Sequence, residues 1–169
     1  MYSRGDWRFV YVPHVVEFTA GIVANKLHKY GTAFHHFFGI RKKLRASASF
    51  WFWVADTLWE LGKHDYALSC IDRAIELFEP KWKYLGWSHR ALILESLGNL
   101  REAIKSTSIA VRLAKRHKWD KLTQAELYRD KADLLLKIGQ RKQARVAIAQ
   151  AVKLAPRSAY IRKVEIAIR

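Results

Sequence analysis

The sequence predicts an all-α fold, an α-solenoid of repeated helical hairpins, and three observations support this prediction. Glycine recurs between pairs of amphipathic stretches, with alanines five and twelve residues further on. Apolar residues around each glycine follow helical rather than alternating spacing. Proline and glycine number only 3 and 8 in 169 residues, which leaves long stretches free to be helical. The three copies are Gly62, Ala67 and Ala74; Gly98, Ala103 and Ala110; and Gly139, Ala144 and Ala151.

The composition indicates one domain with a strongly basic surface. A chain of 169 residues can bury a sizeable core. Lys and Arg number 31 against 15 Asp and Glu, which gives a formal net charge of +16. Such a surplus points to a polyanionic neighbour: nucleic acid, an anionic membrane surface or an acidic protein. The alternative is a basic surface that serves solubility alone.

Cysteine usage and hydropathy exclude several classes of protein. Cys70 is the only cysteine, so neither an internal disulfide nor a cysteine-based metal cluster within the chain is possible. No stretch has 18 uninterrupted apolar residues, and the first 30 residues lack the pattern of a secretory signal. We therefore expect no transmembrane helix and no secretion, and a location in the cytoplasm or in an organellar matrix or stroma.

Residues 1–47 are expected to form an N-terminal arm followed by a degenerate hairpin. The segment Met1–Pro13 is rich in aromatic residues without helical period, and its closing proline is suited to open a helix. A first helix is expected over His14–Tyr30, broken by Gly31, and a second over Thr32–Arg45. With this glycine at the turn, few positions match the later hairpins, so the segment is interpreted as a degenerate hairpin or N-terminal cap.

Residues 48–169 are expected to form three regular hairpins, over about 48–80, 82–117 and 119–155, and a closing helix. Each first helix has an aromatic residue eleven, an alanine seven and a leucine four positions before its glycine. A large ring fills the space between helices, whereas alanine lets two backbones approach closely where helices cross. These residues are Trp51, Ala55 and Leu58; Trp87, Ala91 and Leu94; and Tyr128, Ala132 and Leu135.

This pattern resembles the tetratricopeptide repeat, a helix–turn–helix unit of about 34 residues. The resemblance covers residues 48–156, and Pro156 stands where the family has its closing proline. It implies a right-handed solenoid that binds other proteins.

The spacing departs from the family at the second junction. Gly98 and Gly139 stand 41 residues apart, so we expect the helices around Lys115–Leu122 to be about one turn longer each. Beyond the last repeat, Ser158–Arg169 is expected to be a capping helix. Its apolar residues Ile161, Val164 and Ile168 should face the last hairpin.

No arrangement of residues indicates an enzyme. The seven histidines are scattered, and there is no HExxH motif, glycine-rich phosphate loop or GxSxG motif. His28 with His35 or His36 could meet across the first hairpin and bind a metal, but isolated histidines on helices are more often structural. We therefore predict no catalytic residue, no cofactor, no metal site and no small-molecule substrate.

The family resemblance also implies a partner-binding groove, because fixed positions of each first helix line the family's inner surface. Here these positions are aromatic and acidic, so a bound protein segment should be basic or aromatic. The clamp that chaperone-binding members use is absent, since Phe52 and Asp56 occupy its first two positions. The implied groove residues are Phe52, Asp56, Trp59 and Glu60; Leu85, Ser88, Leu92 and Glu95; and Glu126, Arg129, Asp133 and Leu136.

Basic side chains form a stripe along two of the expected second helices. Their three- and four-residue steps place them on one face of a helix, an arrangement that suits phosphate contacts. A solvated face has the same pattern, so both interpretations stay open. The basic stripe consists of Arg101, Lys105, Arg112, Lys115, Arg116, Arg141, Lys142 and Arg145.

The sequence favours a non-catalytic scaffold that joins proteins within a larger assembly. Apolar residues within Trp7–Val12 favour burial against a partner. One alternative is an RNA-associated protein at the periphery of a ribosome, organellar ribosomes included, which would use the basic stripe. Another is an assembly factor at an anionic membrane surface, with Phe34–Phe38 and the basic run Arg41–Arg45 at the headgroups.

Overall fold

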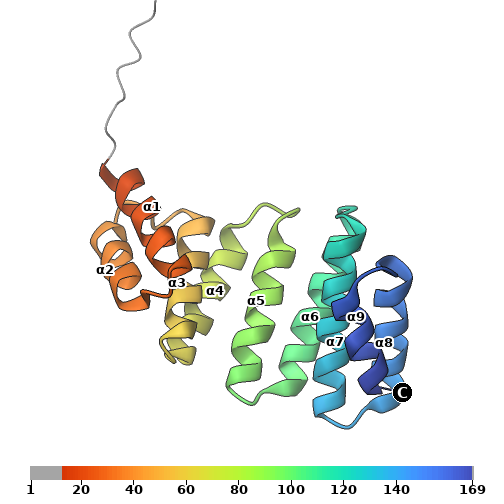
Figure 1. Ribbon diagram of the computed structural model, residues 1–169. Coiled ribbons are helices and arrows are strands. Elements are labelled where there is room, and N and C mark those ends of the chain that lie inside the picture. The colour runs from red at the N-terminus through yellow and green to blue at the C-terminus, as the bar shows by residue number, and fades with distance from the viewer. Residues whose placement is uncertain (1–12, 169) are drawn as a thin grey trace, which may run out of the picture.

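The structure, a computed structural model, describes residues 13–168, with side chains for residues 14–166. This part of the chain forms nine helices and no strand, which confirms the predicted all-α solenoid. The hairpins follow one another in a row from α1 to α8 and α9 (Figure 1). The helices are α1 (Pro13–Lys26), α2 (Tyr30–Ile40), α3 (Ala48–Glu60), α4 (His64–Leu77), α5 (Lys83–Ser96), α6 (Leu100–Arg116), α7 (Lys121–Lys137), α8 (Arg141–Leu154) and α9 (Ala159–Ile168).

Gly62, Gly98 and Gly139 each end a first helix, as predicted. Their φ angles of 71°, 76° and 77° lie in the left-handed region, which glycine enters without steric cost. The residue after each glycine donates its backbone N–H to a carbonyl five residues back, as Lys63 does to Leu58 at 2.8 Å. The second helix then begins two residues after the glycine in all three hairpins.

The expected lengthening at the second junction is confirmed. α6 and α7 have 17 residues each, against 14 in α5 and α8, and the difference is close to one helical turn. Lys118 makes the turn between the longer helices with a φ of 53°. Asp120 then begins α7, because its carboxylate accepts a hydrogen bond from the backbone N–H of Thr123 at 2.9 Å.

The first hairpin turns at His28, so the expectation that Gly31 breaks the chain is wrong. α1 ends at Lys26, and His28 adopts a φ of 58°. Lys29 donates its backbone N–H to the carbonyl of Ala24 at 2.9 Å, the same hydrogen bond that follows each hairpin glycine. Gly31 lies within the first turn of α2.

This shift of three residues corrects the register of the first hairpin. With His28 in the glycine position, Gly21 and Ala33 stand where the later hairpins have alanines seven before and five after the turn. Both are buried. α2 is shorter than expected, since it ends at Ile40, before the basic run.

The helices form two layers, and the described buried apolar residues fall in four clusters along them. α1 contacts α3, α3 contacts α5, and α7 contacts α9, so the first helices and α9 share a layer. Each second helix packs on its own first helix and on the first helix that follows. Close approach at these crossings is possible because the repeated alanines are buried, as expected from the spacing. They are Ala55, Ala67, Ala74, Ala91, Ala103, Ala110, Ala132, Ala144 and Ala151.

α9 closes the last hairpin. Ile161 is buried and Val164 is half-buried against α7 and α8, as expected for a capping helix. The side chain of Ile168 lies outside the described residues, and so does the arm Met1–Val12.

Candidate functional site

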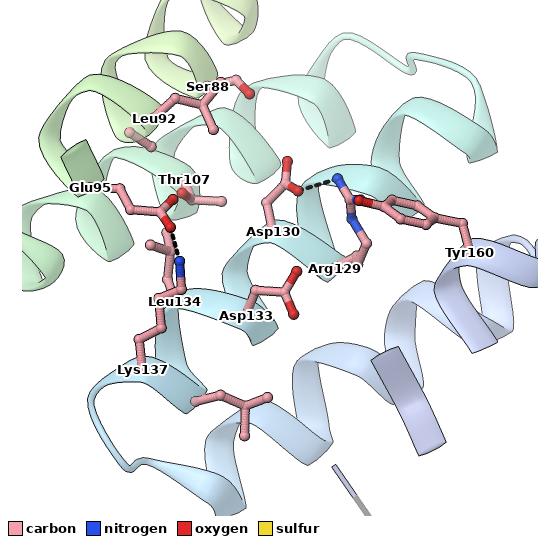
Figure 2. A pocket seen from close by; sticks show the side chains of 12 residues that line it. Ser88, Leu92, Glu95, Thr107, Arg129, Asp130, Asp133, Leu134, Lys137 and Tyr160 are labelled. Carbon is pink, nitrogen blue, oxygen red and sulfur yellow. Dashed lines mark hydrogen bonds and ion pairs between the residues drawn. The ribbon is translucent and has the colours of Figure 1, made fainter. Parts of the chain in front are cut away.

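A cleft of about 440 Å³ opens between α5, α7 and α9. We call it the α5–α7 cleft. Figure 2 shows side chains of the two helices facing each other across this space. Thr107 of α6 and Tyr160 of α9 also line it. Six of the implied groove residues meet here: Ser88, Leu92 and Glu95 from α5, and Arg129, Asp133 and Leu136 from α7.

Two ion pairs line the α5–α7 cleft, and the carboxylate of Asp133 takes part in neither of them. Lys137 pairs with Glu95 of α5, and Arg129 pairs with its neighbour Asp130. Asp133 lies between the two pairs and is joined to neither (Figure 2). Among the residues that line this cleft, the charges therefore sum to a negative value.

The surroundings of Asp133 are partly withdrawn from water. Burial raises the pKa of both Asp130 and Asp133, while the nearby Arg129 guanidinium acts on each in the opposite direction. A carboxylate in such surroundings gains from an added cation more than one in bulk water does. Asp133 is thus the group in this cleft best placed to bind a basic side chain.

The capping helix supplies an aromatic wall of the cleft. Tyr160 of α9 is 62% exposed, and the guanidinium carbon of Arg129 lies 4.3 Å from the centre of its ring. This stacking holds the arginine beside Asp130. The Nε of Arg129 is buried without a hydrogen-bond partner among the described residues. A bound segment would therefore meet both a stacked cation and an exposed ring at this end.

A second cluster, on α3 and α5, surrounds His89. The ring of His89 lies 5.0 Å from that of Phe52 and 5.7 Å from that of Trp59, centre to centre. Its Nε2 lies 3.4 Å from Oδ1 of Asp56. Burial lowers the pKa of His89 to about 4, so the ring is neutral at physiological pH, and burial raises the pKa of Asp56.

The implied groove residues therefore divide among several places. Phe52 and Asp56 enclose His89 and do not line the α5–α7 cleft. Trp59 lines a neighbouring cleft with Leu92 and Glu95, and its indole N–H donates to the hydroxyl oxygen of Ser96 at 2.8 Å.

Three further implied groove residues lie away from the α5–α7 cleft. Leu85 lines a separate cleft between α3 and α5. Glu60 is exposed near Tyr30 of α2, and Glu126 is exposed near the start of α7. Six of the twelve implied groove residues, from α5 and α7, thus line one cleft, and the other six lie elsewhere.

Sequence reasoning missed four charged or aromatic residues of these sites: His89, Asp130, Lys137 and Tyr160. The α9 ring had no sequence signal, because the capping helix lies outside the repeat pattern. Asp130 and Lys137 had a weak sequence signal, because each stands next to an implied groove residue.

The basic stripe lies on the second helices α6 and α8, and all eight of its side chains are exposed. Part of its charge is compensated, because Nζ of Lys105 lies 2.6 Å from a carboxylate oxygen of Glu102. The stripe thus lies on second-layer helices, whereas the α5–α7 cleft is lined mainly by first-layer helices and α9, with Thr107 as its residue from α6.

His28 and His36 of the first hairpin each contact another side chain. His28 lies 2.6 Å from the hydroxyl oxygen of Tyr30, and Nδ1 of His36 lies 2.6 Å from Oε2 of Glu17. Across residues 14–166, no three His, Cys, Asp or Glu side chains are placed to hold a metal ion. Within the described chain, no helix combines the length and apolar character needed to cross a membrane.

Comparison with known proteins agrees with this architecture. The model of the tetratricopeptide repeat family matches residues 48–80, which hold α3 and α4, and residues 125–158, which hold most of α7 and all of α8. A comparison with curated proteins gives no match.

Solved structures share the fold over most of the chain. The crystal structure of MamA protein has 11% identity and a TM-score of 0.73, and the match covers 92% of this chain and 80% of that chain. The apo form of RapI has 12% identity and a TM-score of 0.84, and the match covers 93% of this chain and 63% of that chain. YrrB, described as a TPR protein with an unusual peptide-binding site, has 19% identity and a TM-score of 0.71, with 91% and 75% covered. Such identities show the fold alone, and the family model adds that residues 48–80 and 125–158 of this helical solenoid match the tetratricopeptide repeat.

Proposed function

We propose that this protein is a non-catalytic scaffold that binds a segment of another protein in the α5–α7 cleft, as a structural or assembly subunit of a larger complex. Tetratricopeptide repeats generally mediate protein–protein interactions. The observation that best supports the proposal is the cleft itself, where two ion pairs leave the Asp133 carboxylate without a salt bridge among the described residues.

The lining of the cleft defines the chemistry of its partner. Leu92 and Leu136 offer apolar contact, Tyr160 offers an exposed ring, and Asp133 offers a negative charge. A segment with an aromatic or aliphatic residue close to a lysine or arginine satisfies all three. An acidic segment would meet the carboxylates of Glu95 and Asp133 and be repelled.

The test is a binding measurement with labelled peptide pools on the full chain. One pool is rich in Lys, Arg and aromatic residues, and a second replaces the basic residues with Asp and Glu. We expect the basic pool alone to bind, and Asp133→Asn to weaken that binding by about tenfold, which corresponds to about 1.4 kcal/mol.

Glu126→Gln is the matched control, because Glu126 is an exposed carboxylate on the same helix that does not line the cleft. It should leave binding unchanged. Equal losses in both variants would mean that the peptides respond to overall charge, and the proposed site would be wrong.

A polyanion such as RNA is a second candidate partner, supported by the exposure of all eight side chains of the basic stripe. The membrane alternative loses its main support. Phe37 is buried in the core and Phe34 is half-buried, so of the three phenylalanines in this run only Phe38 is exposed.

A further inference from the structure

A second cleft, of about 500 Å³, lies between α2, α3 and α4 and shares no residue with the α5–α7 cleft. We call it the apolar cleft, because ten of its twelve lining residues are aromatic, aliphatic or cysteine. Its inner wall includes Phe37, Phe50 and Leu58, which are buried in the core. Its rim includes Leu61 and Tyr66, which are 39% and 70% exposed.

The Trp51 indole N–H and the Cys70 thiol in this wall offer no strong hydrogen-bonding group for the backbone of a bound ligand. The indole N–H of Trp51 donates to the carbonyl of Arg45 at 2.8 Å. Burial raises the pKa of the Cys70 thiol to about 11, so it stays neutral. An extended peptide would therefore leave backbone groups without partners in the cleft, at a substantial cost. A helix satisfies its own backbone and has no such requirement.

The two charged residues of the lining are both basic and lie at opposite ends. Arg41 follows α2, near the end where α3 begins, and its guanidinium stacks 3.6 Å from the ring centre of Phe38. Lys63 lies in the turn after α3. Between them the α3 side of the cleft runs from Phe50 to Leu61, about 16 Å at 1.5 Å per residue.

We propose that the apolar cleft is a docking site for an amphipathic helix of a partner protein, with an apolar stripe flanked at both ends by Asp or Glu. The apolar residues of such a helix, at steps of three and four, would fill the space between α2 and α4. Acidic residues about ten positions apart would reach Arg41 and Lys63. A single-headed amphiphile such as a fatty acid could satisfy only one of the two cations. This proposal does not depend on the α5–α7 cleft.

The test uses two synthetic peptides of about 18 residues, long enough to form a helix. They share one leucine stripe and differ only at the flanking positions, which are Glu in one and Lys in the other. On the unaltered full chain we expect the Glu peptide to bind at least about tenfold more tightly, about 1.4 kcal/mol. Oleate serves as a competing probe and should not displace it.

Variants then locate the site. Leu61→Glu places a charge on the apolar rim and should abolish binding of the Glu peptide. Leu122→Glu, at a 52% exposed leucine of α7, should not. Reversing both end charges, with Arg41→Glu and Lys63→Glu together, should transfer the preference to the Lys peptide. Equal binding of the two peptides, displacement by oleate, or binding that survives Leu61→Glu would each overturn the proposal.

Discussion

The ring of Phe37 occupies the space that a side chain on Gly21 would need. A β-carbon built on Gly21 would lie 2.4 Å from Cε1 of Phe37, closer than any non-bonded carbon pair allows. Phe37 is only 1% exposed and packs at an angle of 87° against Phe50. The close approach of α1 to α2 therefore depends on the missing side chain at this position.

We predict that Gly21→Ala destabilises the protein by about 1–3 kcal/mol, because the buried ring of Phe37 has little room to move. The measurement is the free energy of unfolding in urea. Gly31→Ala is the control, since nothing lies within 4 Å of a β-carbon there and Gly31 is also helical. This control should stabilise by about 0.5–1 kcal/mol. Two variants with the same effect would contradict the packing described here.

The turn inside each of the three hairpins of residues 48–156 could be predicted from sequence because glycine marks it. A left-handed backbone disfavours other residues, so Gly62, Gly98 and Gly139 each point to a turn. The first hairpin gave no such signal. His28 adopts the same conformation at a φ of 58°, whereas the nearby Gly31 sits in a helix where nothing requires a glycine. The small residues Gly21 and Ala33 were the available clue to the correct register.

The candidate site was predictable only where the repeat pattern fixes a position. Three pairs of residues stand at equivalent positions of α5 and α7 and line this cleft: Ser88 and Arg129, Leu92 and Asp133, and Glu95 and Leu136. Tyr160 belongs to α9, whose placement no repeat rule gives. Phe52 and Asp56 of α3 instead lie against the ring of His89, and no spacing rule predicts that this histidine packs between α3 and α5.

The neutral ring of His89 makes stability depend on pH. The folded protein keeps His89 unprotonated down to about pH 4, whereas the unfolded chain takes up this proton near the ordinary value of 6.5. The contribution of the neutral His89 ring to the free energy of unfolding is fully present above pH 6.5 and is lost as the pH falls toward 4. The Glu60 carboxylate weakly opposes the shift of His89. Asp56 titrates in the opposite sense, because burial raises its pKa and protonation then favours the folded state.

We predict that the unaltered protein loses about 2 kcal/mol more stability between about pH 7 and pH 5 than His89→Gln does. Urea unfolding at the two pH values measures this difference. The other titrating groups are common to both proteins, so the comparison isolates His89. The control His35→Gln, at an exposed histidine of α2, should follow the unaltered protein. Parallel pH profiles for all three would show that His89 is not held neutral.

The α5–α7 cleft is lined mainly by first-layer helices and the basic stripe lies on second-layer helices, so we expect two partners to bind independently. We predict that Arg101→Glu, Arg112→Glu and Arg141→Glu together abolish binding of a single-stranded RNA probe. Binding of the basic peptide pool in the cleft should persist. Binding of the RNA to the unaltered protein should fall steeply with salt, since contacts to phosphates release counterions.

The matched control reverses three exposed cations outside the stripe, Lys26, Arg73 and Lys81, and so changes the net charge by the same amount. If RNA binding reflects the stripe, this control retains most of the affinity of the unaltered protein at each salt concentration. If it reflects only the formal charge of +16, the two triple variants lose affinity alike. Loss of peptide binding in the stripe variant, with its circular dichroism unchanged, would show that the two surfaces are coupled, and their independence would be wrong.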